Sequence, residues 1–201
     1  MGLYSKYILP TLLNSVMKRE EMEKHRPDAV GMATGVILEI GFGSGLNLPY
    51  YTNVTELYAL DPSRELYDLA QERIAKASFP VKYLQSSAEE IPLQNDSVDS
   101  VVSTWSLCSI PHPEVALKEM FRVLKPGRKF FFIEHGKSPK NFIAQLQKFF
   151  TPLSKVCAGG CHMDREVENL LLEVGFVIEK LGTFEQKGKP FAFMYKGVAI
   201  K

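Results

Sequence analysis

Apolar positions along the chain follow two alternating patterns. Short apolar runs predict strands, which lie at Val36–Ile40, Glu56–Leu60, Val81–Gln85, Val98–Thr104 and Lys129–Glu134. Apolar residues at helical spacing predict helices between them, at Arg64–Ala77 and His112–Leu124. Buried strands that alternate with helices are typical of βαβ units. The middle of the chain is therefore predicted to form a parallel sheet that is covered on both faces.

The beginning of the chain departs from this alternation. An apolar stripe within residues 3–25 predicts a helix, and its members are Leu3, Tyr7, Ile8, Leu12, Leu13, Val16 and Met17. Pro10 is expected to divide this helix in two, because proline suits a first turn and not a helix interior. Residues 1–30 are therefore predicted to form a helical segment that precedes the α/β domain.

The end of the chain indicates an antiparallel pair. A helix at Glu166–Val174 is predicted to stop at Gly175, which is a favourable residue after a helix C-terminus. Strands at Phe176–Phe184 and Ala192–Ile200 then flank Lys187-Gly188-Lys189-Pro190, a sequence typical of a hairpin turn. We expect one domain over residues 31–201.

A glycine-rich turn follows the first strand directly, in the sequence Gly41-Phe42-Gly43-Ser44-Gly45. Glycine lets the backbone approach a ligand and adopt conformations that a β-carbon forbids. Asp61 ends the next strand, twenty residues after Gly41. This spacing places a carboxylate beside the ribose of an adenosine-containing ligand, so NAD and S-adenosylmethionine both fit at this point.

Two residues favour S-adenosylmethionine over NAD. The dinucleotide fingerprint has its third glycine at position 46, where this chain has Leu46. Glu39, two residues before Gly41, would repel a pyrophosphate and attract the cationic methionyl end of S-adenosylmethionine. The alternative for Glu39 is a carboxylate that only accepts backbone N–H bonds from the turn.

Further motifs follow the glycine turn in order, namely Leu60-Asp61-Pro62-Ser63, Ser87-Ala88-Glu89-Glu90-Ile91-Pro92-Leu93 and Val123-Leu124-Lys125-Pro126-Gly127. Between about Val36 and His135 the chain thus resembles the class I S-adenosylmethionine-dependent methyltransferases of the "methyltransferase type 11" group. A narrower resemblance, to the methyltransferase-like 7 proteins and their bacterial relatives, rests on Gly45-Leu-Asn47-Leu-Pro49-Tyr50-Tyr51, Leu107-Cys108-Ser109-Ile110, Glu134-His135 and Gly160-Cys161-His162. The resemblance implies a Rossmann-like α/β fold with strand order 3-2-1-4-5-7-6, strand 7 antiparallel and helices on both faces.

The resemblance also implies residue roles. The turn residues Gly41, Phe42, Gly43 and Gly45 would line the methionyl part of the cofactor. Asp61 would bind the ribose, with Pro62 and Ser63 beside the adenine and with Ser87 and Ala88 at the adenine edge. The family usually has Asp where this chain has Ser87, and a neutral hydroxyl makes a weaker bond than a charged group.

Three more residues are candidates for contact with the cofactor. Asn47 follows the glycine turn, where it suits both an N-cap and a cofactor contact. Thr104 and Trp105 end the fourth strand at the edge where the methyl group would lie, although Trp105 also fits a partly buried surface aromatic.

Glu134 and His135 close an otherwise apolar strand at the same edge and are the candidate catalytic residues, since His is a natural base near neutral pH. The alternative is a hydrogen-bonded pair that fixes the following loop. Cys157 and Cys161 have a C-x₃-C spacing that structural zinc sites also use, but such sites normally have four ligands. Only one adjacent histidine, His162, accompanies the two cysteines, and no second pair of ligands follows. We expect no metal and a loop that lines the substrate pocket.

Composition narrows the class of partner. The net charge is +1 and no basic run is present, which disfavours nucleic acid. Three cysteines are read as reduced thiols in a cytoplasmic protein. The apolar stripe at the N-terminus is interpreted as a lid over the substrate, in preference to a membrane anchor.

We therefore expect an S-adenosylmethionine-dependent methyltransferase acting on a small molecule: a thiol, a phenolic or quinone precursor, or a lipid headgroup amine. The alternatives are a nicotinamide-dependent oxidoreductase and a non-catalytic S-adenosylmethionine-binding protein that acts through a partner.

Overall fold

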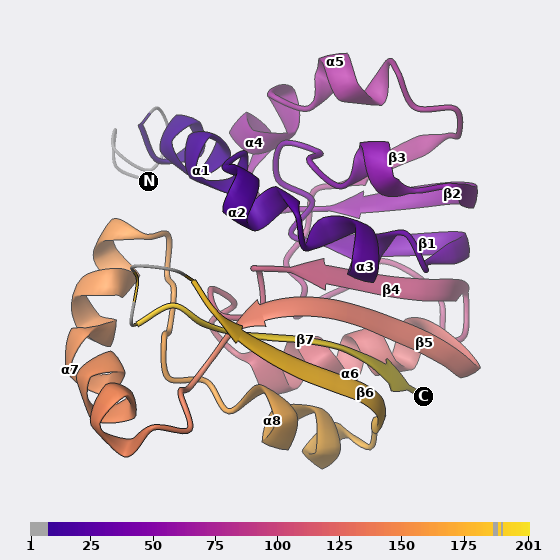
Figure 1. The fold of residues 1–201 in the computed structure, drawn as a ribbon. Coiled ribbons are helices and arrows are strands. Elements are labelled where there is room, and N and C mark those ends of the chain that lie inside the picture. Colours follow the sequence, from indigo (N-terminus) through magenta and orange to yellow (C-terminus); the bar gives the residue numbers. More distant parts are fainter. Residues whose placement is uncertain (1–7, 187–188, 190) are drawn as a thin grey trace.

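The computed structural model describes residues 8–186, 189 and 191–201, and within them seven strands form one sheet. The strands are β1 (Thr34–Ile40), β2 (Asn53–Leu60), β3 (Val81–Leu84), β4 (Val98–Thr104), β5 (Leu124–His135), β6 (Val177–Glu185) and β7 (Phe193–Ile200). Their order is β3-β2-β1-β4-β5-β7-β6, and β7 runs antiparallel to both of its neighbours (Figure 1). The predicted strand order and the antiparallel last strand are confirmed.

Helices cover both faces of this sheet (Figure 1). They are α1 (Leu9–Met17), α2 (Glu20–Glu23), α3 (Arg26–Val30), α4 (Arg64–Asp68), α5 (Gln71–Ile74), α6 (Pro113–Val123), α7 (Asn141–Cys157) and α8 (Val167–Val174). A short 3-10 helix, η2, spans Leu48–Tyr50. The predicted class, an α/β fold with a mostly parallel sheet, is confirmed.

The central strands are buried on both faces because each face packs into its own apolar cluster. On one face Leu38, Phe130 and Phe132 pack with residues of α6 and α8. On the other face Ile37 and Phe131 pack with residues of α3 and η2. Burial on both faces explains why these strands are apolar runs in the sequence instead of alternating patterns.

Two helix predictions need correction, and one helix was not predicted. The helix predicted over Arg64–Ala77 is two shorter helices, α4 and α5, and Ser63 caps α4 by accepting a hydrogen bond from the Leu66 amide at 3.2 Å. Asn47 precedes η2, but its side chain does not cap that helix. The seventeen-residue helix α7 was not predicted at all. Its inward positions Gln147 and Thr151 are polar, so it lacks the apolar inner stripe by which helices are recognised.

The N-terminal segment is only partly described. α1 begins at Leu9, beside Pro10, and the helix predicted before Pro10, with Leu3 and Tyr7, lies outside the described residues. α3 packs beside β5 and β7, with Ala29 and Val30 buried. Of the predicted hairpin turn, residues 187, 188 and 190 also lie outside the described part.

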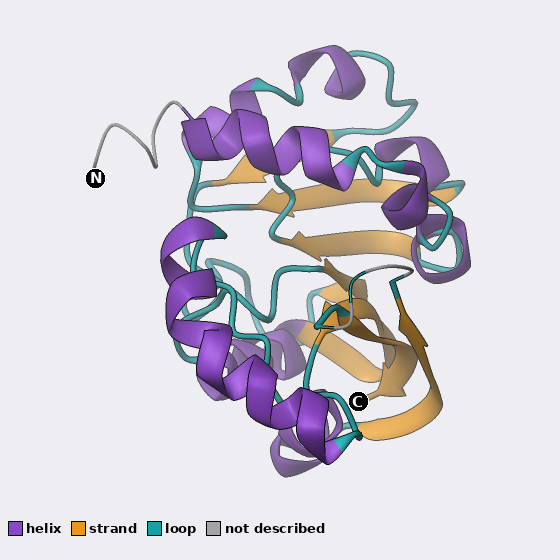
Figure 2. Cartoon of the chain, turned by 60° about the vertical axis from the view of Figure 1, so that its left-hand side comes forward, coloured by secondary structure: helices purple, strands orange, loops and turns teal. Residues whose placement is uncertain are grey.

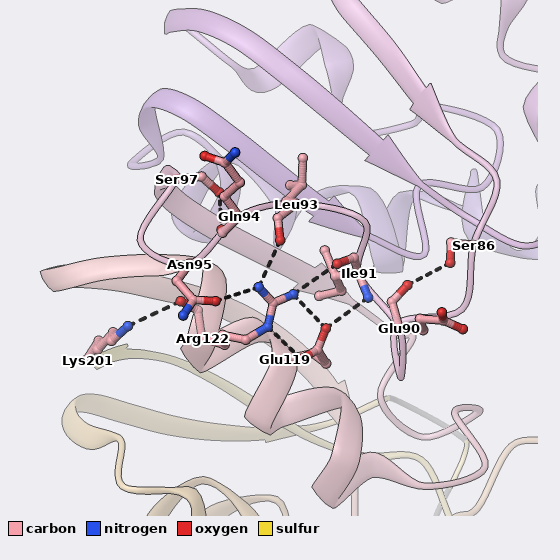
Figure 3. A network of polar contacts seen from close by, with 10 residues as sticks. All are labelled: Ser86, Glu90, Ile91, Leu93, Gln94, Asn95, Ser97, Glu119, Arg122 and Lys201. Atoms are coloured by element: carbon pink, nitrogen blue, oxygen red, sulfur yellow. Dashed lines mark hydrogen bonds and ion pairs between the residues drawn. The ribbon is translucent and has the colours of Figure 1, made fainter.

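The loop between β3 and β4 is fixed from outside the sheet by Arg122 of α6. Figure 3 shows its guanidinium donating to the carbonyls of Leu93 and Ile91, at 2.8 and 2.9 Å, and to Asn95 Oδ1 at 2.8 Å. Glu119 pairs with the same guanidinium and also accepts from the Ile91 amide. The loop that begins at Ser87 is therefore held rigidly relative to the sheet.

Within the described ranges, none of the helices combines the length and the apolar character needed to cross a membrane.

Candidate active site

A cavity of about 420 Å³ opens at the carboxyl ends of β1, β2 and β4. Twelve of the thirteen predicted cofactor-contacting residues line it: Glu39, Gly41, Phe42, Gly43, Asn47, Asp61, Pro62, Ser63, Ser87, Ala88, Thr104 and Trp105. Gly45 does not, because it packs behind the turn against Leu48, Phe42 and Ala70. The sequence motifs therefore converge on one site, at the edge where parallel sheets bind ligands.

The glycine turn takes a backbone path that requires glycine. Gly41 and Gly43 have φ angles of +63° and +57°. A β-carbon on Gly41 would lie 2.0 Å from Ser106 Oγ, whereas one on Gly43 would meet only the Gly41 carbonyl, at 3.8 Å. The turn thus passes tightly against the loop after β4 and leaves open space on its cavity side.

Asp61 fastens the turn to the end of β2. One carboxylate oxygen accepts from the Gly43 amide at 2.8 Å and the other accepts from the Ser63 amide at 2.8 Å. Burial raises the pKa of Asp61, although both backbone bonds act in the opposite direction. Each carboxylate oxygen keeps a further lone pair, so Asp61 can still accept from two hydroxyl groups of a ligand.

Glu39 is the centre of a buried polar network. It accepts from Asn47 Nδ2 at 2.9 Å and from the Tyr51 hydroxyl at 2.7 Å. Asn47 also donates to Thr104 Oγ1 at 3.0 Å and accepts from Arg26 at 2.5 Å. Burial raises the pKa of Glu39 to about 7, despite these bonds. Near neutral pH the cavity therefore holds a carboxylate whose charge a bound cation would favour.

Arg26 and Trp105 are two buried donors at this network. The Arg26 guanidinium lies 4.8 Å from the centroid of the Trp105 ring, and Trp105 holds a φ of +54°. Arg26 Nε and Trp105 Nε1 have no hydrogen-bond partner among the described residues. Unpaired buried donors are costly in a folded protein, so a polar ligand in this cavity fits them. Sequence reasoning gave no role to Arg26, which lies outside the motifs, or to Tyr51, which stands in the motif after the glycine turn but was not assigned a contact.

Ser87 and Ala88 form the far wall of the cavity, on the loop that Arg122 holds. The Ser87 hydroxyl donates to Glu89 Oε2 at 2.8 Å and also accepts from the Glu89 amide at 3.3 Å. Ser87 thus stands where the family pattern has a carboxylate, with the carboxylate of Glu89 directly beside it.

The predicted catalytic residues lie outside the described lining of the cavity. Glu134 is fully buried and accepts from Ser103 Oγ at 2.6 Å, from the Leu107 amide at 3.0 Å and from the Ser106 amide at 3.3 Å. Burial raises its pKa to about 7. Glu134 thereby fixes the turn after β4 that carries Trp105, whereas the alternative considered from the sequence was a hydrogen-bonded pair that fixes the loop after β5.

His135 faces away from the cavity and into the protein. Its Nε2 contacts the Phe191 carbonyl at 2.9 Å and its Nδ1 contacts Cys161 Sγ at 3.4 Å. Burial lowers the pKa of His135, but the contacts with Cys161 and Phe191 together raise it above the ordinary value. A hydrogen bond with Cys108, more than the one with His135, lowers the pKa of Cys161 to about 5. A catalytic role for Glu134 or His135 stays a prediction that lacks a contact with the cavity.

Part of the cavity rim comes from α1 and from the turn after α7, which are distant in sequence. α1 contributes Leu9, Leu13 and Met17, and the turn after α7 contributes Ala158 and Gly159. The loop predicted to line the pocket does so at these two residues, whereas Cys157, Cys161 and His162 are absent from the lining.

Comparisons with known proteins identify the family of the chain. A family described as a methyltransferase domain matches residues 38–132. The thiol S-methyltransferase TMT1B of Rattus norvegicus is 32% identical over 81% of this chain and 71% of its own length. A phosphatidylethanolamine N-methyltransferase of Cereibacter sphaeroides is 30% identical over 76% of both chains. A solved SAM-dependent methyltransferase of Aquifex aeolicus superposes with a TM-score of 0.67, at 20% identity, over 95% of this chain and 97% of its own.

Proposed function

Because the chain belongs to the class I S-adenosylmethionine-dependent methyltransferases of the type 11 group, we propose that it methylates the sulfur of a small lipophilic thiol. Membership of this family also identifies the cofactor as S-adenosylmethionine and not NAD, both of which fit the glycine turn and Asp61 in the sequence. The finer part of the proposal, the thiol, is supported mainly by the chemistry of the described cavity lining.

The ionisable lining residues all belong to the cofactor wall. In the described lining these are Arg26, Glu39, Asp61 and Glu65. Asp61 is suited to the ribose hydroxyls, and Glu39 to the cationic methionyl end. Arg26 is committed to Asn47 and to the Trp105 ring. The described part of the rim includes Leu9, Leu13, Ile110, Pro111 and Ala158, and it offers an acceptor an apolar surface with no general base among these described residues.

Without a base, the acceptor has to ionise by itself. At pH 7.5 a thiol with a pKa of about 8.5 is roughly one-tenth thiolate. A phenol with a pKa of about 10 is only roughly 0.3% ionised, and an alkylammonium with a pKa of about 10.4 is roughly 0.1% deprotonated. With no base in the described cavity lining, the deprotonated, reactive fraction of a thiol is more than ten times that of a phenol, a quinol or a headgroup amine. The described lining therefore favours a thiol.

Bound S-adenosylmethionine supplies a methyl group on a sulfonium, which is already a good leaving group. The acceptor thiolate forms the new carbon–sulfur bond as the old one breaks, the thiol proton goes to solvent, and the neutral thioether of the cofactor remains. The residues of this chain need only hold the two reactants in line and exclude water. The relative named as a thiol S-methyltransferase supports this choice of acceptor.

We also propose that α1 is the part of the N-terminal segment that acts as a lid. Leu9, Leu13 and Met17 line the cavity. Asn14 Oδ1 accepts from Ser44 Oγ at 2.8 Å, which ties the helix to the glycine turn. An apolar helix fastened to the cofactor loop is suited to close over an acceptor once the cofactor is bound.

The test compares three acceptors that share one alkyl chain and differ in a thiol, a phenol or an amine group. With radiolabelled methyl donor, we expect turnover of the thiol to exceed that of the others by at least tenfold. The rate should rise with pH up to the pKa of the thiol used. Turnover of the phenol or amine without the thiol would overturn the proposal. Cofactor binding with no turnover of any acceptor would favour a non-catalytic role.

A further inference from the structure

Helix α7 carries its large apolar side chains on the outside of the molecule. Phe142, Phe149, Leu153 and Val156 are 70%, 74%, 61% and 74% exposed. Their spacing of seven, four and three residues places them on one side of the helix. We call these four residues the α7 apolar face. Exposed apolar faces of this kind mark interaction surfaces, since a helix normally buries such a stripe.

The inward side of α7 is polar, and its hydrogen bonds fix how the helix is turned. Gln147 is fully buried. It accepts from the Ser138 amide at 2.8 Å and donates to the carbonyls of Gly136 and Phe191 at 3.1 and 2.9 Å. Rotating the helix to bury its apolar face would leave these groups unpaired in the interior. The outward direction of the apolar face is therefore built into the fold.

The charges beside this face are of one sign. α7 contains Lys148 and Lys155 and no Asp or Glu. Neither lysine has an ion-pair partner in the described part of the chain. A helix with an aromatic apolar face, flanking lysines and no acidic residue has the character of a helix that lies in the interface of an anionic membrane. Lysine beside such a face also attracts acidic lipid headgroups.

The cavity opens on the same side of the molecule. Figure 1 has α1 and α7 at one end, and Figure 2, turned so that this end comes forward, shows both helices in front. A β-carbon on Gly159, two residues after α7, would lie 3.5 Å from Leu9 and 3.8 Å from Leu13. Ile8, directly before α1, and Leu12 within α1 are two further exposed apolar residues, at 57% and 47%. The cavity rim therefore joins two helices that both expose apolar side chains.

We propose that α7, assisted by Ile8 and Leu12, docks on an anionic membrane surface and turns the cavity mouth toward the lipid. A lipophilic acceptor dissolved in the bilayer would then reach the cavity without crossing water. The docking goes beyond the proposed methyl transfer and does not depend on which acceptor is used.

The experiment measures co-sedimentation of the full chain with vesicles of phosphatidylcholine mixed equally with phosphatidylglycerol, and with vesicles of phosphatidylcholine alone. We expect binding to the anionic vesicles that weakens at high salt, and at least tenfold weaker binding to the neutral ones. The double variant Phe149→Gln/Val156→Gln should lose at least tenfold in vesicle binding. Its melting temperature should not change, because both side chains are exposed.

The matched control is Val177→Gln. Val177 is an exposed apolar residue, with 64% of its surface accessible. It begins β6 and pairs with Ile200 of β7, which in turn pairs with Lys129 of β5. These residues lie at the end of the sheet opposite to the cavity. This variant should bind vesicles like the unaltered chain. A second test, Lys148→Glu/Lys155→Glu, should remove the preference for anionic lipid.

Three results would overturn the docking proposal. The first is that the unaltered chain does not bind vesicles, and the second is that the Phe149/Val156 variant binds them as well as the unaltered chain does. The third is that the unaltered chain is a dimer which this variant converts to a monomer, because the α7 apolar face would then contact a second copy of the chain. No acceptor is present in the assay. Vesicle binding without thiol turnover would therefore refute the proposed function alone, and thiol turnover without vesicle binding would refute the docking alone.

Discussion

The two sides of the cavity are built on opposite principles. On the cofactor side, the carboxylates of Asp61 and Glu39 lie at the ends of apolar strands and are held in place by hydrogen bonds. On the rim, α1 presents apolar side chains to the cavity. The neighbouring helix α7 presents apolar side chains to the outside, and its polar residue Gln147 points inward. The cofactor side is thus defined by fixed polar geometry. The rim is defined by apolar surface, which tolerates different acceptors.

The largest effect should come from Glu134, which supports the cofactor side from behind. Glu134→Ala leaves the Leu107 amide and the Ser103 hydroxyl without their buried acceptor. We expect a loss of roughly 3 kcal/mol or more in the free energy of unfolding. Thermal melting measures it, and Glu134→Gln, which keeps an acceptor oxygen, is the control. Equal melting temperatures for Glu134→Ala and the unaltered chain would show that this carboxylate is not structural.

Removing part of the rim should affect turnover and spare the cofactor side. Deletion of residues 1–25 removes α1 and α2 but keeps Arg26. We expect a folded protein that binds S-adenosylhomocysteine and has lost about 100-fold in turnover, since small errors in positioning have effects of this size. Calorimetry and a vesicle-free methyl-transfer assay measure the two properties.

Two single substitutions refine the deletion. Leu13→Ala changes a residue of the cavity lining, and Leu12→Ala changes its exposed neighbour. Only the first should lower turnover. If the deleted protein melts at a lower temperature and the surviving fraction turns over normally, α1 is a structural helix and not a lid.

Asp61→Ala tests the cofactor side directly. The loss of a carboxylate that bonds two hydroxyls should weaken cofactor affinity by about 1.5–3 kcal/mol, which is roughly 10- to 100-fold. Calorimetric titration with S-adenosylhomocysteine measures this loss. Asp68→Ala, which removes an exposed carboxylate paired with Arg64, is the control and should bind normally. Unchanged affinity in a folded Asp61→Ala protein would remove Asp61 from the ribose site.

The smallest effect concerns pH. Burial raises the pKa of Glu39 to about 7, so Glu39 is mostly neutral at pH 6 and mostly ionised at pH 8. Affinity for the cationic cofactor should rise about tenfold over this range, following the ionised fraction of Glu39.

The effect of Glu39 on the free energy of unfolding has the opposite sign. A neutral buried Glu39 stabilises the fold most below its ordinary pKa, and this stabilisation is lost as the pH rises toward 7.

Variants of the two buried glutamates separate these contributions. Glu39→Gln should bind the cofactor with an affinity that no longer changes between pH 6 and pH 8. Glu134→Gln should keep the pH dependence, because Glu134 has a similarly raised pKa but does not line the cavity. A pH dependence that survives in Glu39→Gln and disappears in Glu134→Gln would reverse this assignment.

The cofactor side could be predicted from the sequence because its signals are local. Glycines that need positive φ, and acids that end buried strands, appear as short motifs at fixed spacing, as at Gly41 and Asp61. The rim could not be predicted in the same way. α7 has polar residues where a helix normally has its apolar stripe, and Arg26 reaches Asn47 across twenty-one residues of sequence. A contact between distant segments leaves no periodic trace in one sequence.

The prediction for Glu134 and His135 shows the same limit on a smaller scale. Both residues end a buried strand at the active edge, as the sequence indicated. The side to which each side chain points depends on the neighbouring loops, and these turn Glu134 toward the Leu107 amide and His135 toward Phe191.

The attachment of α7 through Gln147 bears on how such an enzyme can diversify. Gln147 holds the helix by bonding to main-chain atoms of Gly136, Ser138 and Phe191, which any sequence presents. Substitutions elsewhere on α7 leave that attachment intact. A lineage can therefore vary the outward side of this helix, and with it the surface on which the protein docks, without rebuilding the sheet or the cavity. For the same reason, a library that randomises the outward residues of α7 and keeps Gln147 is a direct starting point for changing, by directed evolution, the lipid composition to which the protein binds.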